Sequence, residues 1–335
     1  MGIGATRGYE KLIHLLILIF LLWFMGWRLN VGCDFFGYAS RYEGIFPWDS
    51  PLNALEKNEP GFEIIVSILK ANGFQYLWVN VVSSAIMLLC YYRYFRISQK
   101  PLAEIALLFP VIILQLSMSG LRQGIAVAML TAACAEFVRG KRMGTAVWIV
   151  LAAQFHASAV VFLPLAALAG RPVSMRKLIG AIAILTPLAA YLMGEQFDDY
   201  TDQYVRQIYG DSSSAGALPR YLLVLVPSLY FWRYHREFSE LMPRWSPLFQ
   251  VFSLGAIFIA PLFLVSSMIV HRMSFYFMPV SIMIAANAYR VIDERSKKYL
   301  LKIMPFFLYG IYMIVWLSIS GHAERCYIPY QSYSF

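Results

Sequence analysis

Ten long apolar stretches dominate this chain and leave little sequence between them. An apolar run of about 17–25 residues fits a helix that crosses the hydrocarbon core of a bilayer. Of the 335 residues, 59% are hydrophobic and 14% are charged, whereas a soluble domain carries about 25% charged residues. The sequence therefore predicts an all-α integral membrane protein without a soluble domain of useful size. The predicted spans lie near residues 12–28, 75–95, 102–118, 121–138, 143–170, 178–193, 220–234, 247–265, 272–289 and 299–318.

The distribution of Lys and Arg predicts the orientation of these spans, because short cytoplasmic segments are enriched in basic residues. If the N-terminus is inside and 143–170 makes two short passes that meet near His156, most of the 28 basic residues lie inside. A single pass would invert the downstream helices and place the Arg290–Lys302 cluster outside. We therefore predict about ten to eleven crossings, with the C-terminus outside. The net charge of +9 then reports topology and does not indicate a nucleic-acid partner.

The outside segments are the long and elaborate ones, so any chemistry is expected on that face. We treat residues 1–335 as a single polytopic transmembrane domain with external loops 29–74 and 194–219. Within the first loop, Pro60 is predicted to begin a short interfacial helix that ends at Gly73. The second loop is polar and aromatic, which suits contact with carbohydrate or an ordinary external loop.

Two arginines are predicted at the outer mouths of helices. Arg122 and Gln123 open the span near 121–138, where free N–H groups and a guanidinium together suit a phosphate or diphosphate. Arg272 holds a matching position in a second helix, so the two arginines could clamp a pyrophosphate. A snorkelling arginine at a helix end is the alternative interpretation. Arg220 and Arg206 are weaker candidates for the same role.

Three further residues on the predicted outer face can transfer a proton. Glu59 and Asp34 are carboxylates, and His156 lies at the polar break between two short apolar runs. Each also has an ordinary interpretation, as a loop acid or as a hydrogen-bonded structural histidine. Tyr38 is placed to stack on a sugar ring, although aromatic residues are also enriched at membrane interfaces. The sequence does not choose a base among the three.

Several common motifs are absent from the sequence. There is no Walker motif, no HExxH, no paired-aspartate motif in a cytosolic loop and no Cys/His spacing typical of a metal site. Asp198 and Asp199 form only a generic acidic pair. We therefore expect neither a cofactor nor a metal. Because no cytosolic domain is available to bind a nucleotide sugar, a transferase built on this chain would use a lipid-linked donor.

The order of six short motifs carries a family resemblance. In sequence order they are CDFFGYASRY (33–42), EPGFE (59–63), GLRQGIAVA (120–128), QFHASAVVFLP (154–164), HRMSFYF (271–277) and CYIPY (326–330). The most specific are the Arg-Gln-Xaa-Xaa-Ala step that begins at Arg122 and the His-Ala-Ser step that begins at His156. Together they resemble the EpsG-like branch of the Wzy-type polysaccharide polymerases, over nearly the whole chain.

The resemblance implies a GT-C-like polytopic glycosyltransferase in the bacterial inner membrane, with its active site on the periplasmic face. Such enzymes join oligosaccharide repeat units carried on undecaprenyl diphosphate into O-antigen, capsule or exopolysaccharide. The implied partners are that lipid-linked oligosaccharide, membrane lipids and a polysaccharide chain-length regulator. The two long external loops would then line a vestibule for the substrate.

The residues fit the chemistry that the resemblance implies. The leaving diphosphate needs cationic groups, which Arg122 and Arg272 supply, and the amide of Gln123 is expected to bind the diphosphate beside them. Tyr38 and Arg220 would contact substrate. The acceptor hydroxyl needs a base from Glu59, Asp34 or His156. A ligase, which transfers a finished glycan to another lipid or protein, is one alternative, although its late external loop is typically longer. A transporter of lipid-linked glycan is a second alternative, but the chain lacks two related halves.

Two of the four cysteines fall on the predicted outer face. Cys33 lies in the first external loop and Cys326 in the tail, whereas Cys90 and Cys134 lie near the inner face. The space outside the membrane permits disulfides. A Cys33–Cys326 bridge would tie the first loop to the tail.

Overall fold

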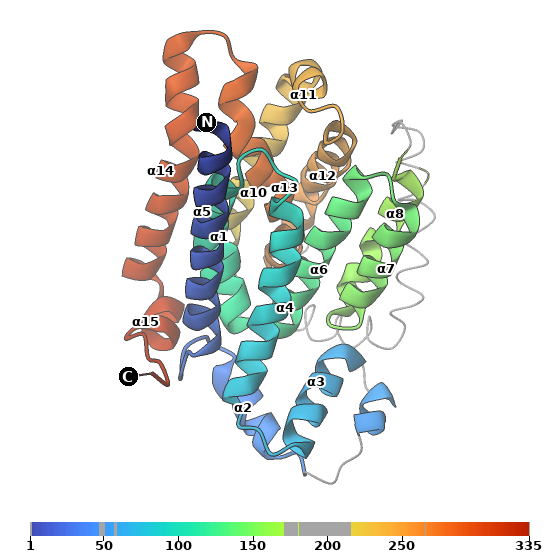
Figure 1. The fold of residues 1–335 in the computed structure, drawn as a ribbon, viewed down its shortest axis with the longest axis vertical. Helices are drawn as coiled ribbons and strands as arrows, with labels where there is room; N and C mark the ends of the chain where they lie inside the picture. Colours follow the sequence, from blue (N-terminus) through green and yellow to red (C-terminus); the bar gives the residue numbers. More distant parts are fainter. Residues whose placement is uncertain are drawn as a thin grey trace.

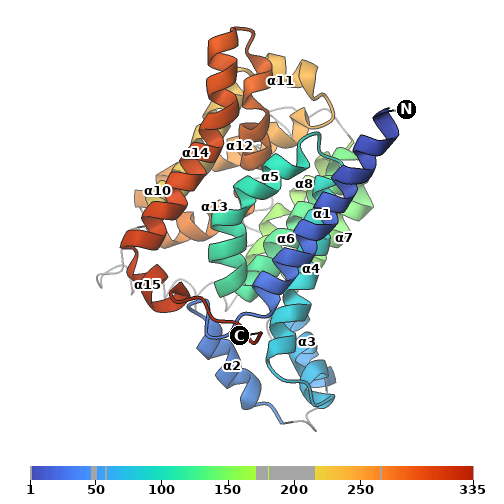
Figure 2. The ribbon, with the colours of Figure 1, turned by 60° about the vertical axis from the view of Figure 1, so that its left-hand side comes forward.

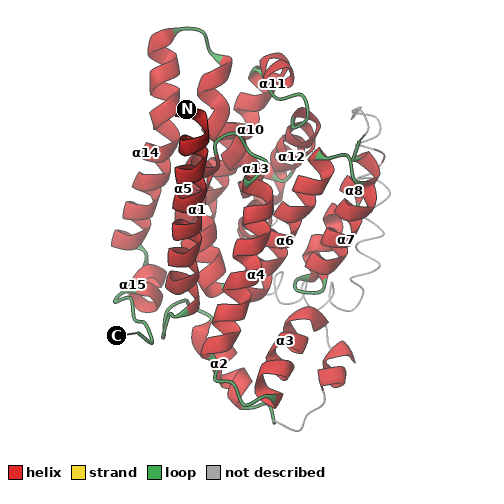
Figure 3. Cartoon of the chain, viewed as in Figure 1, coloured by secondary structure: helices red, strands yellow, loops and turns green. Residues whose placement is uncertain are grey.

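The computed structural model describes residues 2–46, 51–56, 59–170, 180, 216–264 and 266–334. Within these ranges the chain is helical and contains no strand (Figure 3). The predicted all-α polytopic membrane fold is confirmed. Apart from residue 180, the predicted span near 178–193 lies outside the described residues, and so does the external loop as far as residue 215, including Arg206.

The described helices follow the apolar runs of the sequence. Among the described residues, four helical segments are long and apolar enough to cross a membrane: 121–138, 246–264, 267–291 and 295–319. Two of these segments, 246–264 and 267–291, include the short helical turn that follows the main helix. The long helices are α1 (Gly2–Gly26), α4 (Leu77–Phe95), α5 (Pro101–Leu108) with its π-helical continuation η2 (Phe109–Ser117), α6 (Leu121–Val138), α10 (Ala217–Arg233), α12 (Ser246–Phe258), α13 (Ser267–Asn287) and α14 (Arg295–Ile319).

Helix α6 forms the centre of the bundle, with α4 and α7 packed against it (Figures 1 and 2). The alanines and Gly124 of α6 have small side chains or none, and small residues let membrane helices approach closely. A Cβ atom at Gly124 would lie only 3.0 Å from the Met87 side chain on α4. Helix α14 lies at the edge of the bundle and is largely exposed, as expected of a helix that faces lipid.

The stretch 143–170 breaks where the sequence predicted a break. Helix α7 (Arg142–Ala153) ends before Gln154, and His156 has an extended backbone. The short helices η3 (Ala157–Phe162) and α8 (Pro164–Leu168) follow and pack back against α7. The prediction of two short segments that meet near His156 is therefore confirmed, and the break places His156 at one end of the bundle.

The segment 29–74 folds into short helices at that same end: α2 (Phe35–Glu43), η1 (Pro51–Glu56) and α3 (Pro60–Ala71), close to α15 (Gly321–Tyr327) (Figure 2). Helix α3 confirms the predicted helix between Pro60 and Gly73, since Pro60 opens it and Gly73 follows its end with a positive φ. At the opposite end lie α11 (His235–Leu241) and η5 (Ala288–Val291), which precedes α14 (Figure 1). The short helix η4 (Ala260–Leu264) follows α12.

The C-terminal tail is joined to the start of the segment 29–74. Cys33 and Cys326 form a disulfide, and the backbone N–H of Leu29 donates to the carbonyl oxygen of Gln331 over 2.9 Å. Gly32 has a φ of +102°, and a Cβ atom there would lie 1.9 Å from the carbonyl oxygen of Met118, so only glycine fits. These contacts hold the loop that precedes α2 in a fixed place.

Candidate active site

Glu59, Arg122 and His156 form one cluster at the end of the bundle that carries α2 and α3. The Nη1 of Arg122 lies 3.0 Å from Glu59 Oε2, and the Nδ1 of His156 lies 2.7 Å from Glu59 Oε1. The backbone N–H of Ala157 also donates to Oε1 over 3.1 Å. Three residues that the sequence singled out separately therefore share one carboxylate.

The backbone around Glu59 is specially shaped. Glu59 has a φ of 61°, in the left-handed region that residues with a side chain seldom adopt. The next turn abuts the break after α7, where the N–H of Gly61 donates to the carbonyl oxygen of Gln154 over 2.9 Å. A Cβ atom at Gly61 would lie 2.9 Å from the Phe155 ring. Glycine thus allows the approach that brings Glu59 to His156. Unusual backbone geometry of this kind concentrates at functional sites.

The carboxylate of Glu59 is nearly buried, at 8% exposure of its side chain. Burial by itself would raise its pKa. The hydrogen bond from His156, the charge of Arg122 and the N–H of Ala157 outweigh burial, so the pKa of Glu59 lies below its usual range. Glu59 is therefore a stable anion at neutral pH and a weak proton acceptor.

The Glu59 contact determines which nitrogen of His156 carries a proton. A carboxylate only accepts hydrogen bonds, so Nδ1 of His156 must donate to it. In neutral imidazole the other nitrogen, Nε2, then holds a lone pair. Within the described residues Nε2 makes no hydrogen bond. A carboxylate that orients a histidine in this way also stabilises the imidazolium that forms when Nε2 takes a proton.

The start of α6 brings the second predicted arginine nearby. The amide of Gln123 donates to the backbone carbonyl of Arg272 over 3.0 Å, which joins α6 to α13. The Arg122 guanidinium also lies 6.0 Å from the centre of the Tyr38 ring on α2. Four predicted residues (Arg122, Gln123, Arg272 and Tyr38) thus surround the same end of α6.

One detail of the prediction for Arg272 is wrong. Helix α13 begins at Ser267 rather than at Arg272, because Ser266 caps it by accepting a hydrogen bond from the N–H of Ile269 over 3.4 Å. Arg272 therefore lies in the second turn, where the backbone N–H groups already have partners inside the helix. Its contribution to an anion site is its side chain and not a helix terminus.

The two remaining predicted residues lie elsewhere. Asp34 precedes α2, where its backbone N–H donates to Ser119 Oγ over 3.3 Å. Its carboxylate makes no hydrogen bond or ion pair with any described residue. Arg220 is buried on α10, where it donates to Gln115 Oε1 over 2.7 Å and to the Tyr312 hydroxyl over 3.2 Å. Neither residue contacts the Glu59 cluster.

Sequence reasoning overlooked several polar partners. Ser158 and Tyr276 share a hydrogen bond of 2.9 Å between η3 and α13. The signal for Tyr276 is its spacing, since it follows Arg272 by four residues and so shares a helix face with it. Gln115, the partner of Arg220, is a lone amide in an apolar run, and a polar side chain inside a membrane helix usually has a defined role.

A group of Cys and His side chains near the tail does not form a metal site. Cys33, His322 and Cys326 place their ligand atoms within 4.8 Å of one another. The two cysteines are joined in a disulfide, so neither offers the thiolate that binds a metal.

The sequence was also compared with known proteins. It matches the EpsG family over residues 11–332. Comparisons with curated proteins and with solved structures gave no match. The matched range contains every residue of the Glu59 cluster and extends over nearly all of the chain. The chain therefore belongs to the EpsG family.

Proposed function

We propose that this protein is a polysaccharide polymerase that joins undecaprenyl-diphosphate-linked repeat units at the outer face of the bacterial inner membrane. EpsG family membership supports a polysaccharide polymerase-like function, and the apolar helices support a membrane location. The observation that carries the catalytic part of the proposal is the shared contact of Glu59 with His156 and Arg122. It combines a proton acceptor and a cation at one point.

The proposed reaction is a direct transfer between two lipid-linked glycans. A hydroxyl of the acceptor unit attacks the anomeric carbon of the growing chain, and the bond from that carbon to the lipid diphosphate breaks. Nε2 of His156 takes the hydroxyl proton, while Glu59 orients the ring and stabilises its positive charge. The departing lipid diphosphate leaves with the bonding electron pair.

Arg122 and Arg272 are proposed to hold that diphosphate. Negative charge on the leaving group grows as its bond to the sugar breaks, and fixed guanidinium groups stabilise this charge. About a third of the Arg122 side chain is exposed (36%), so it can reach a ligand while it contacts Glu59. The hydrogen bond from the Gln123 amide to the backbone carbonyl of Arg272 holds together the turn of α6 that carries Arg122 and the turn of α13 that carries Arg272. Because arginines supply the charge in this proposal, it requires no metal ion.

Replacing Gly61 by alanine is expected to lower polymerase activity at least about 10-fold, because a small misplacement of catalytic groups is costly. The added Cβ meets the Phe155 ring and the Gln154 carbonyl oxygen, which moves Glu59 away from His156. Gly37→Ala on α2 is the matched control, since a Cβ there meets nothing within 4 Å. Equal activity of the Gly61→Ala and Gly37→Ala proteins would contradict the proposed role of the contact.

The pH dependence of stability tests the charge on Glu59. Because the folded pKa lies below the ordinary value of 4.5, this group stabilises the fold fully above pH 4.5 and loses its contribution as pH falls through the folded value. We expect the difference in Tm between the wild type and Glu59→Gln to be constant above pH 4.5 and to shrink below it. Thermal unfolding in detergent across this range measures the difference. A difference that grows on acidification would contradict the assignment.

The product distinguishes a polymerase from a ligase. Purified protein is incubated with a synthetic undecaprenyl-diphosphate-linked repeat unit and a second lipid acceptor, and the products are separated by size and by lipid. A polymerase yields a ladder of longer glycans on undecaprenyl diphosphate. Glycan that appears only on the second lipid would replace the proposal with a ligase.

A further inference from the structure

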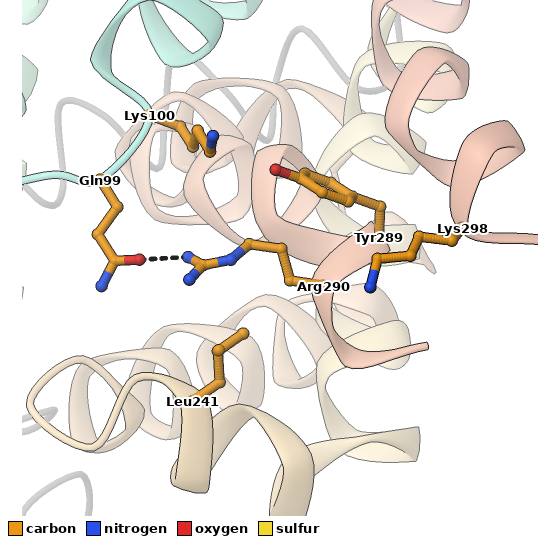
Figure 4. A pocket seen from close by; sticks show the side chains of 6 residues that line it. All are labelled: Gln99, Lys100, Leu241, Tyr289, Arg290 and Lys298. Carbon is orange, nitrogen blue, oxygen red and sulfur yellow. Dashed lines mark hydrogen bonds between the residues drawn. The ribbon is translucent and has the colours of Figure 1, made fainter. Parts of the chain in front are cut away.

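A basic cavity lies at the end of the bundle opposite the Glu59 cluster. It has a volume of about 390 Å³ and lies between the chain that precedes α5, the end of α11, η5 and the start of α14. Its lining residues are Gln99, Lys100, Leu241, Tyr289, Arg290 and Lys298 (Figure 4). Sequence analysis predicts this end to be on the cytoplasmic side, because it carries the Arg290–Lys302 cluster.

The charge of this cavity is not neutralised within the described part of the chain. Lys100, Arg290 and Lys298 line it, no carboxylate does, and none of the three forms an ion pair with a described residue. The nearby Glu294 pairs with Lys297 instead, over 2.6 Å. A second cavity at this end is lined by two arginines, Arg139 and Arg244, and Arg139 is paired with Glu136 over 2.6 Å.

The guanidinium of Arg290 is held in place by neutral groups. It donates to Gln99 Oε1 and, over 3.0 Å, to Asn287 Oδ1 (Figure 4 shows the contact with Gln99). Asn287 is fully buried and is itself fixed by donating to the carbonyl oxygen of Met283 over 2.9 Å. Arg290 is therefore held in one orientation by neutral partners, and no carboxylate among the described residues neutralises its charge. A fixed, uncompensated guanidinium is suited to bind an anionic ligand.

Apolar surface next to the cavity indicates where the ligand comes from. Leu241 contributes an apolar wall. Beyond Lys298, α14 exposes Tyr299 (68%) and Leu300 (61%), and Ile303 follows one turn later. Only 11% of the apolar window of α14 is buried inside the protein. Because α14, which carries Lys298, is largely exposed along its apolar length, a phosphate bound at the cations would lie at the end of a lipid-facing helix.

We propose that the cavity of Lys100, Arg290 and Lys298 binds the phosphodiester headgroup of an anionic phospholipid, with the acyl chains along α14. Basic pockets between membrane helices on the cytoplasmic side suit such headgroups. The site requires only that the protein lies in a membrane, so it does not rest on the proposed polymerase activity. It would bind lipid on the face opposite the candidate active site.

The test is a titration of the purified full-length protein with phosphatidylglycerol, followed by native mass spectrometry. The Lys100→Gln/Lys298→Gln protein is expected to bind this lipid at least about 10-fold more weakly than the wild type, since each basic residue near the surface attracts anionic lipid. Arg233→Gln/Arg236→Gln is the control, because it removes two exposed charges that line neither cavity at this end. This control is expected to bind like the wild type.

Two competing ligands distinguish the sources of phosphate. Phosphatidylcholine, which is zwitterionic, and inorganic phosphate are each expected to leave bound phosphatidylglycerol in place. Wild-type affinity in the Lys100→Gln/Lys298→Gln protein would overturn the site. Displacement of the lipid by inorganic phosphate would overturn the lipid assignment, and displacement by phosphatidylcholine would overturn the requirement for charge.

Discussion

Replacing Arg122 by alanine is expected to lower the rate of glycan polymerisation at least about 100-fold, the usual effect of removing one group that stabilises transition-state charge. The change removes the cation proposed to hold the leaving diphosphate and the 3.0 Å contact with Glu59. Arg122→Lys keeps the charge but loses the forked geometry of the guanidinium, so it should restore only part of the rate. Ladder formation from a lipid-linked repeat unit measures the rate.

Arg41 provides a matched control for that substitution. It also pairs with a glutamate near the start of α3, Glu63, over 2.8 Å, but it lies on the exposed side of α2. Arg41→Ala removes one arginine and one ion pair from the same region without touching the cluster. We expect it to polymerise at nearly the wild-type rate. If Arg122→Ala were as active as Arg41→Ala, the diphosphate role of Arg122 would be wrong.

Replacing Glu59 by glutamine is expected to cost between about 100-fold and 10,000-fold in rate, as when an orienting carboxylate is lost from a carboxylate–histidine pair. The amide no longer carries the negative charge that stabilises a protonated His156. It can also donate to Nδ1, which favours the tautomer with its proton on Nε2. His156→Ala should lower the rate at least as much, and the double variant should be no worse than His156→Ala, because the two residues act as a unit.

Glu63→Gln is the control for the Glu59 variant. Glu63 follows Glu59 by four residues, is nearly buried and is held in an ion pair with Arg41. It therefore tests whether loss of any paired carboxylate near the start of α3 is harmful. We expect Glu63→Gln to retain ladder formation. Independent, multiplicative losses in Glu59→Gln and His156→Ala would show that they do not act as a unit.

The long helices were predictable from sequence because each reflects a local property, the length of an apolar run, whereas the short polar helices α2, α11 and α15 have no such signal. The start of α13 is the informative exception. The polar residues His271 and Arg272 lower the hydropathy of its first turns, so the run alone predicted a later start. The cap at Ser266 decides the true start, and it depends on one side-chain hydrogen bond.

The sequence predicted which residues belong to the candidate site, but it did not predict which of them contact one another. Glu59, Asp34 and His156 are all polar residues predicted on the outer face, so the sequence alone does not favour one of them as the base. Separating them requires contacts between residues far apart in the chain, such as Glu59 and His156, which have a sequence separation of 97. That contact depends on the break after α7 and on the close approach at Gly61, which are tertiary features.

The most direct test of this account is polymerisation by the purified protein in EDTA. The substrate is a synthetic undecaprenyl-diphosphate-linked repeat unit, and the products are resolved as a ladder by size. The account predicts a ladder from the wild type and Glu63→Gln in EDTA, and unextended substrate from Arg122→Ala and Glu59→Gln. A ladder that requires added divalent cation, or one that Glu59→Gln produces at the wild-type rate, would contradict it.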